Sequence, residues 1–189
     1  MKSFKQMIHL TFLAALAACG GDSSGPGTDA GESGSLRFTY SGGGAAGGTF
    51  QAAGAVPTSG TLGNWAGGGR IDDPQGTTIL LTGVTRVGSK YHRMSIELQG
   101  VTTGTYNLDD ECEARCAFAA VSFGIASWTD MGERSCVLEE GQVTLTSLSA
   151  TEAKGTFSGV GVCMSNGVSE EPFRVTGGTF DLPLVAMQG

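Results

Sequence analysis

The cysteines are the residues whose type and spacing suggest the clearest chemistry in this chain. One of the five directly follows an apolar N-terminal segment, and the other four lie in the second half of the sequence. In an exported chain an even number of cysteines favours two disulfides. A four-thiolate zinc site is the rival, but the spacing C-x3-C-x19-C-x26-C contains no C-x2-C pair. The four residues are Cys112, Cys116, Cys136 and Cys163.

Four cysteines allow three pairings. We expect Cys136–Cys163 together with Cys112–Cys116. Cys136 leads into a predicted strand, and Cys163 ends the predicted hairpin partner of that strand, so the two thiols should lie near the same end. Cys112 and Cys116 share one predicted loop, which a short bridge can close.

The fifth cysteine, Cys19, ends a segment that has the form of an export signal. Lys2 and Lys5 make a basic start, and about 12 mostly apolar residues follow, where a membrane-spanning helix needs about 20. Leu16-Ala17-Ala18-Cys19 resembles the lipobox of bacterial lipoproteins, which are cut just before a cysteine that carries diacylglycerol. The resemblance implies cleavage after Ala18 and a lipid on Cys19; an ordinary signal with a chance cysteine is the alternative.

The segment after Cys19 predicts how the domain is attached. Residues 20–34 read GGDSSGPGTDAGESG, which is too polar and glycine-rich to build a core and predicts a disordered tether. We therefore divide the chain into a signal peptide at 1–18, a lipidated cysteine and tether at 19–34, and a single domain at 35–189. Gly20 resembles the residue found in lipoproteins sent to the outer membrane, so we expect a cell-envelope protein anchored there.

The remaining chemistry-bearing residues do not form a recognised catalytic set. His92 is the one histidine after the signal, and its strand position on the side of Met94 and Ile96 predicts a partly buried residue without a catalytic relay. No HExxH helix or phosphate-binding loop is present. We expect neither an enzyme nor a cofactor.

Two weaker kinds of site are compatible with the sequence. Asp109, Asp110 and Glu111 could supply oxygens to Ca²⁺, although a solvated acidic loop explains them better and we expect no metal. Trp65 and Trp128 could stack on a sugar, although aromatic residues more often belong to a β core.

The elements that would position these residues are strands. Glycine makes up 32 of 189 residues, and short apolar–polar alternations are separated by Gly, Asp, Asn and Pro. This pattern predicts an all-β domain, an antiparallel β-sandwich or a closed β-barrel of about ten short strands. The expected strands are 36–40, 49–53, 64–71, 77–86, 91–99, 105–108, 117–127, 142–148, 155–163 and 173–184.

Two patterns within these strands make specific predictions. A Gly-Thr-aromatic motif recurs at residues 48–50, 104–106, 155–157 and 178–180, with irregular spacing that favours convergent strand starts over a true repeat. Residues 142–162 should form a hairpin in which Phe157 lies on the side of Val143 and Leu145.

The last 90 or so residues also carry a family resemblance. Gly141-Gln142-Val143-Thr144-Leu145-Thr146, Lys154-Gly155-Thr156-Phe157-Ser158-Gly159 and Val175-Thr176-Gly177-Gly178-Thr179-Phe180-Asp181 resemble the strands of a group of uncharacterised bacterial lipoproteins. The resemblance implies an all-β domain and an envelope location, and it supplies no activity.

The net charge of the chain limits the classes of partner that it can bind. Without Lys2 and Lys5 the chain has nine basic and 18 acidic residues, a net charge of −9, which disfavours binding to nucleic acid. We therefore expect a non-enzymatic, lipid-anchored β domain with a binding or structural role, its partners being the membrane and a glycan or an envelope protein. A surface carbohydrate-binding module is the alternative.

Overall fold

The computed structural model describes residues 33–57, 62–73, 76–100, 102–109, 115–127, 130, 132–165 and 168–187. The predicted signal, Cys19 and the tether up to residue 32 therefore lie outside the described residues. Within the described residues no helix is long and apolar enough to cross a membrane.

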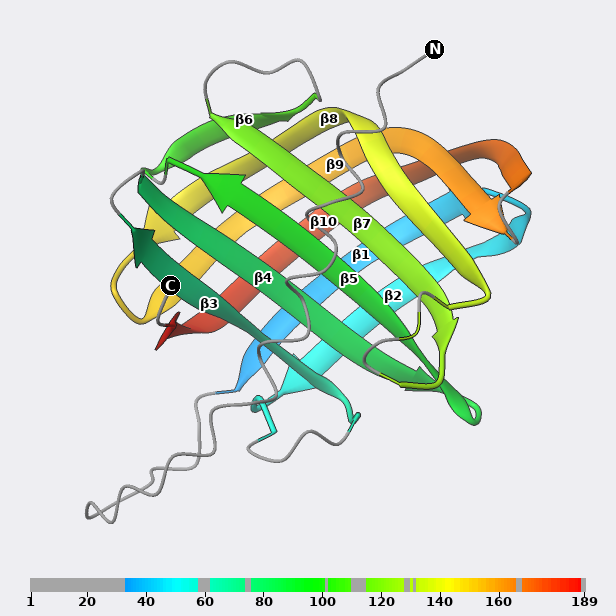
Figure 1. Ribbon diagram of the computed structural model, residues 1–189, viewed down its shortest axis with the longest axis horizontal. Coiled ribbons are helices and arrows are strands. Elements are labelled where there is room, and N and C mark those ends of the chain that lie inside the picture. The colour runs from blue at the N-terminus through cyan, green and yellow to red at the C-terminus, as the bar shows by residue number, and fades with distance from the viewer. Residues whose placement is uncertain are drawn as a thin grey trace.

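Ten strands make up the described chain, which confirms the all-β prediction (Figure 1). They are not all short, because β8, β9 and β10 have 15, 14 and 20 residues. Register shifts interrupt the pairing of each of these long strands, and such bulges let a strand bend and continue where the sequence suggests a break. The strands are β1 (Gly34–Gly42), β2 (Ala45–Gly54), β3 (Trp65–Asp73), β4 (Gly76–Val87), β5 (Lys90–Gln99), β6 (Gly104–Leu108), β7 (Cys116–Ile125), β8 (Arg134–Leu148), β9 (Glu152–Ser165) and β10 (Val168–Met187).

All ten strands belong to one sheet with the order β2-β1-β10-β3-β4-β5-β7-β6-β8-β9. Because β9 also pairs with β10, a path of hydrogen-bonded neighbours runs through eight strands and returns to its start. Figure 1 shows β3, β4, β5 and β7 in front of β9, β10, β1 and β2. The main hydrophobic core is built from buried residues of these strands together with those of β1 and β2.

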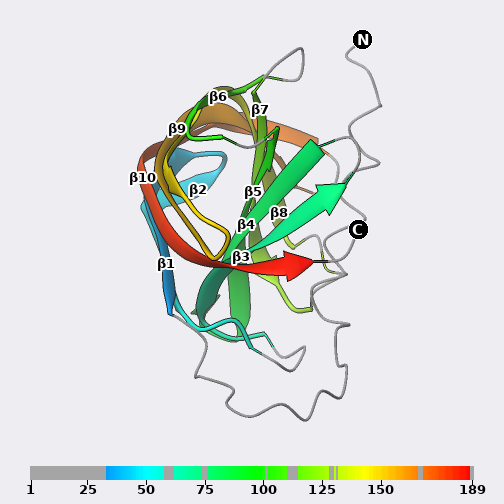
Figure 2. The same cartoon turned by 90° about the vertical axis from the view of Figure 1, so that its left-hand side faces the viewer.

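The long strand β10 connects the two sides of the molecule. Its residues from Phe173 to Asp181 pair with β1, and its end from Leu184 to Met187 pairs with β3 (Figure 2). The β10–β3 and β6–β7 pairings are parallel, so the prediction of an antiparallel sheet is wrong at these two places and right for the other described pairings. The β10–β3 contact joins strands that are distant in sequence, which short-range turn signals do not report. The strands β6 and β7 are consecutive, and their parallel pairing covers two residue pairs.

The hairpin predicted for residues 142–162 is confirmed. The antiparallel strands β8 and β9 place Val143 directly opposite Phe157, and both side chains are buried. Leu145 is buried as well, whereas Thr144 and Thr146 lie on the other face. The register inferred from the alternating pattern is therefore correct.

The Gly-Thr-aromatic motif has one local structure in all four places. The aromatic residue is buried at Phe50, Tyr106, Phe157 and Phe180, while the preceding threonine is exposed. Since successive side chains of a strand point to opposite faces, the motif orients each of these strands relative to the core.

Strands β4 and β5 form a tight hairpin. Val87 pairs with Lys90 across Gly88, whose φ of 63° is the left-handed conformation that such two-residue turns require. On β5 the predicted inner face is confirmed, because Met94 and its two successors at alternate positions are fully buried. On the opposite face Arg93 and Ser95 are each only 6% exposed, so β5 is covered on both sides at this point.

Candidate functional site

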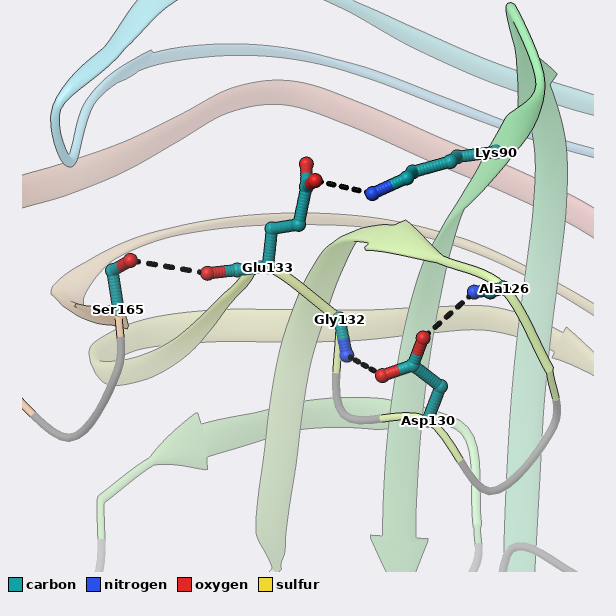
Figure 3. Close-up of polar contacts among 6 residues, drawn as sticks. All are labelled: Lys90, Ala126, Asp130, Gly132, Glu133 and Ser165. Carbon is teal, nitrogen blue, oxygen red and sulfur yellow. Dashed lines mark hydrogen bonds and ion pairs between the residues drawn. The ribbon is translucent and has the colours of Figure 1, made fainter.

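A network of polar contacts lies where β5 begins and the β7–β8 connection passes (Figure 3). The carboxylate of Asp130 accepts hydrogen bonds from the backbone N–H groups of Gly132 and Ala126, each at 2.8 Å. These two bonds lower the pKa of Asp130 because they stabilise its charged form. Asp130 therefore holds the connection in shape, with one backbone N–H group bonded to each of its carboxylate oxygens.

The same network ties the connection to two other strands. Lys90 of β5 forms an ion pair with Glu133, and the Ser165 hydroxyl of β9 donates a 3.1 Å hydrogen bond to the Glu133 carbonyl oxygen. The two charged side chains are 42% and 68% exposed, and ion pairs in such positions contribute little to stability. Figure 3 shows the Lys90 ammonium and the Glu133 carboxylate pointing toward each other above the loop.

His92 lies beside this network and is partly buried, as the sequence predicts. It is half-buried, and its ring meets the edge of the Phe123 ring at a centroid distance of 4.9 Å. Burial lowers the pKa of His92, and the Glu133 charge opposes this shift. No hydrogen bond joins His92 to another side chain in the described part of the chain, and its ring contact with Phe123 is a packing contact.

The acidic residues are in different places. Asp109 is exposed just after β6, while its predicted companions Asp110 and Glu111 lie outside the described residues. Asp72 on β3 accepts hydrogen bonds from Arg70 and from Thr77, which lower the pKa of its carboxyl group. No cluster of three or more metal-binding side chains occurs in the ranges that the structure describes.

The structure describes one of the two tryptophans that were candidates for sugar binding. Trp65 is 2% exposed at the start of β3, so its ring is not available to stack on a ligand and the suggested role in sugar binding is wrong for this residue. The small residues around Trp65 let neighbouring chain approach and cover its ring, in agreement with the core position that aromatic residues usually take. Trp128 lies outside the described residues, and its role stays a prediction.

One disulfide joins β8 and β9. Cys136 and Cys163 are opposite each other in the register and are fully buried, in agreement with the expected pairing. Cys116 at the start of β7 is also disulfide-bonded, and Cys112 lies outside the described residues.

Sequence reasoning missed a row of hydroxyl groups on the outer face. Thr179 on β10 pairs with Thr156 on β9, which pairs with Thr144 on β8, which pairs with Thr105 on β6. The hydroxyl oxygens of Thr105 and Thr144 are 3.2 Å apart. Three of the four threonines come from the Gly-Thr-aromatic motif, so the motif could have suggested a common face. The alignment itself depends on the register of β8, β9 and β10, which are consecutive in sequence, and on the pairing of β6 with β8 across the intervening β7.

The comparisons with known proteins add no further assignment. No protein-family model, no curated protein and no solved structure matches the chain.

Proposed function

We propose that this protein is an exported β domain, anchored to the outer membrane of a bacterial cell envelope by a lipid on Cys19, with a non-enzymatic binding or structural role. The observation that carries the proposal is the buried disulfide between Cys136 and Cys163. Disulfides of this kind persist in oxidising compartments outside the cytosol, where a lipobox signal would deliver the chain.

The described polar groups support a role without catalysis. The best-organised carboxylate, Asp130, is occupied by two backbone N–H groups, and the half-buried His92 packs against an aromatic ring. A nucleophile would need a base in hydrogen-bond reach and a third group that orients the base. The surface of the sheet, rather than a catalytic cleft, is therefore the part of the molecule that we expect to act.

The anchor is tested by labelling producing cells with an alkyne-bearing fatty acid. We expect the full-length protein to take up the label and to sediment with membranes, and we expect Cys19→Ser to lose both properties. Ser24→Ala in the tether is the matched control and should behave like the unchanged protein. Intact-mass analysis that finds Cys19 unmodified, or label that persists in Cys19→Ser, would refute the lipid anchor.

Carbohydrate binding remains a second proposal, because the row of Thr105, Thr144, Thr156 and Thr179 favours it. The row presents hydroxyl donors and acceptors at the strand spacing of about 4.8 Å. Each solvent-exposed hydrogen bond contributes little. Useful affinity would therefore come from a polysaccharide that contacts several threonines together.

This second proposal is tested by affinity electrophoresis in gels containing soluble polysaccharides. Thr144→Val with Thr156→Val keeps the side-chain shape and removes two hydroxyls of the row, so retardation by a bound polysaccharide should disappear. Thr39→Val with Thr49→Val, which removes two exposed hydroxyls outside the row, is the control. Equal retardation of both double variants would exclude the threonine row as the sugar site.

For the finer architecture we propose a closed barrel in preference to a two-layer sandwich. Its support is the hydrogen-bonded path through eight strands that returns to β10. A sandwich of two separate sheets would expose further edges, whose amides exchange rapidly. Hydrogen exchange should therefore be slow along both edges of β3 and β9, and fast exchange along either strand would favour the sandwich.

A further inference from the structure

Strand β2 differs from every other described strand in having one hydrogen-bonded neighbour. It pairs with β1, whereas each of the other nine has at least two hydrogen-bonded partners. None of the hydrogen bonds outside the strand ladders involves residues 45–54 among the described part of the chain. A strand in this position presents alternate N–H and C=O groups that can pair with another chain.

The sequence of β2 lacks the features that usually protect such an edge. It reads AAGGTFQAAG, with neither proline nor a charged residue, and no charged residue occurs between Arg37 and Arg70. Proteins commonly block exposed edges with lysine, proline or a bulge. The pairing of β1 with β2 is regular from Gly54 to Gly48, and its one register shift lies next to the turn.

The side chains of β2 also suit an extension of the sheet. Phe50 and Ala52 are buried against the core, while Thr49, Gln51 and Ala53 are exposed on the outer face. An added strand would continue both faces without the desolvation of a charged group of β2. The edge of β2 thus offers a regular row of backbone N–H and C=O groups, and most of its exposed side chains are small.

We propose that β2 pairs antiparallel with β2 of a second copy of this chain, so that the sheet continues across a two-fold axis. The charge distribution makes β2 the edge at which two copies can meet without opposing like charges. Two copies, each with a net charge of −9 after removal of the signal, repel one another over most surfaces, and β2 brings an uncharged edge from both sides. The pairing needs no anchor, although lipid anchoring under the proposed function would raise the local concentration of copies.

Cysteine crosslinking in producing cells tests the interface with the full chain. In an antiparallel pair, directly opposed residues share a face with Cβ atoms about 4.5–5.5 Å apart. Single cysteines at positions 49, 51 and 53 should therefore give, for at least one of them, a disulfide-linked species of twice the chain mass on a non-reducing gel. Cysteines at positions 156 and 158 on β9, exposed on a strand with two neighbours, are the controls and should stay monomeric.

A charge variant gives an independent measurement. Thr49→Lys with Gln51→Lys should weaken self-association at least about tenfold in sedimentation experiments. The reason is that like charges placed opposite each other across an interface lower the affinity by more than about a factor of ten. Thr156→Lys with Ser158→Lys on β9 should leave association unchanged, and circular dichroism verifies that both variants fold. Absence of the crosslink, equal crosslinking of β2 and β9, or a crosslink to a different protein would each overturn the proposal. If the full-length protein is soluble and carries no lipid but still forms the β2 crosslink, the lipid anchor is refuted and the proposed β2 interface stands.

Discussion

Strands β2 and β9 contain the same tripeptide in different surroundings. Gly48-Thr49-Phe50 lies in a strand with one neighbour, and Gly155-Thr156-Phe157 lies in a strand paired with β8 on one side and β10 on the other. In both strands the threonine faces solvent and the phenylalanine is buried. The local motif therefore decides which face is apolar, and it does not decide whether a strand is central or at an edge.

The surroundings of the two glycines show what the second neighbour changes. A Cβ atom on Gly155 would lie 2.2 Å from the Thr144 carbonyl oxygen and 2.5 Å from the Phe180 ring. A Cβ atom on Gly48 would first meet the Tyr40 hydroxyl, at 2.8 Å. The central strand is thus confined by backbone, while the edge strand is confined by the end of a side chain that can move.

The largest expected effect concerns the shared part of the motif. Phe157→Ala and Phe50→Ala should each lower the free energy of unfolding by about 3–5 kcal/mol, because both remove a buried aromatic ring. Thr156→Ala and Thr49→Ala on the opposite face should each cost less than about 1 kcal/mol. Denaturant titrations that give equal losses for phenylalanine and threonine in either strand would show that its faces are assigned wrongly.

Removing the disulfide should reduce the difference in resistance to local opening between β9 and β2. Cys136→Ala with Cys163→Ala eliminates a bridge across a sequence separation of 27 residues, which the chain-entropy relation values at about 3–4 kcal/mol. Hydrogen exchange should then show β8 and β9 opening more readily, toward the behaviour of β2. A double variant as stable as the unchanged protein would mean that strand pairing alone holds β8 to β9.

The two glycine substitutions test the difference directly. Gly155→Ala should cost about 1–3 kcal/mol, since the backbone of β8 cannot give way to the new methyl group. Gly48→Ala should cost less than about 1 kcal/mol, because Tyr40 can shift and alanine restricts the unfolded chain more than glycine does. Thermal unfolding of the two variants gives the ranking, and a larger loss for Gly48→Ala would reverse our description of the edge.

The smallest expected effect is a pH dependence centred on His92. Its folded pKa is lowered from 6.5 by burial, so the unfolded chain takes up the proton at a higher pH than the folded protein does. The stability contributed by neutral His92 is therefore complete above pH 6.5 and decreases as the pH falls toward the folded pKa.

The readout for His92 is amide exchange at pH 8 and at pH 5.5. The His92 ring packs on Phe123, whose ring lies 5.2 Å from that of Tyr40 on β1, so β1 and β2 should lose protection before β9. His92→Gln should reduce this decrease. If the variant and the unchanged protein lose the same protection, other titrating groups cause the effect.

The sequence alone determined the class and the local geometry of this protein. Alternation of apolar and polar residues predicted a strand within each of the ten observed ones, because the side chains of a strand alternate with a period of two residues. It missed residues 134–141 of β8. The same alternation placed Phe157 opposite Val143 and brought Cys136 and Cys163 to one end of a hairpin. These are properties of neighbouring segments joined by a short turn.

Only the tertiary structure decided which strands meet when they are far apart in sequence. The parallel contact of β10 with β3, the threonine row across four strands and the position of β2 at the edge all depend on the order of strands in the sheet. Burial of Trp65 belongs to the same group, since flanking glycines permit both an open ring and a covered one. Periodicity in a sequence reports the face of a strand, and it carries no information on its distant neighbours, which the packing of the whole core selects.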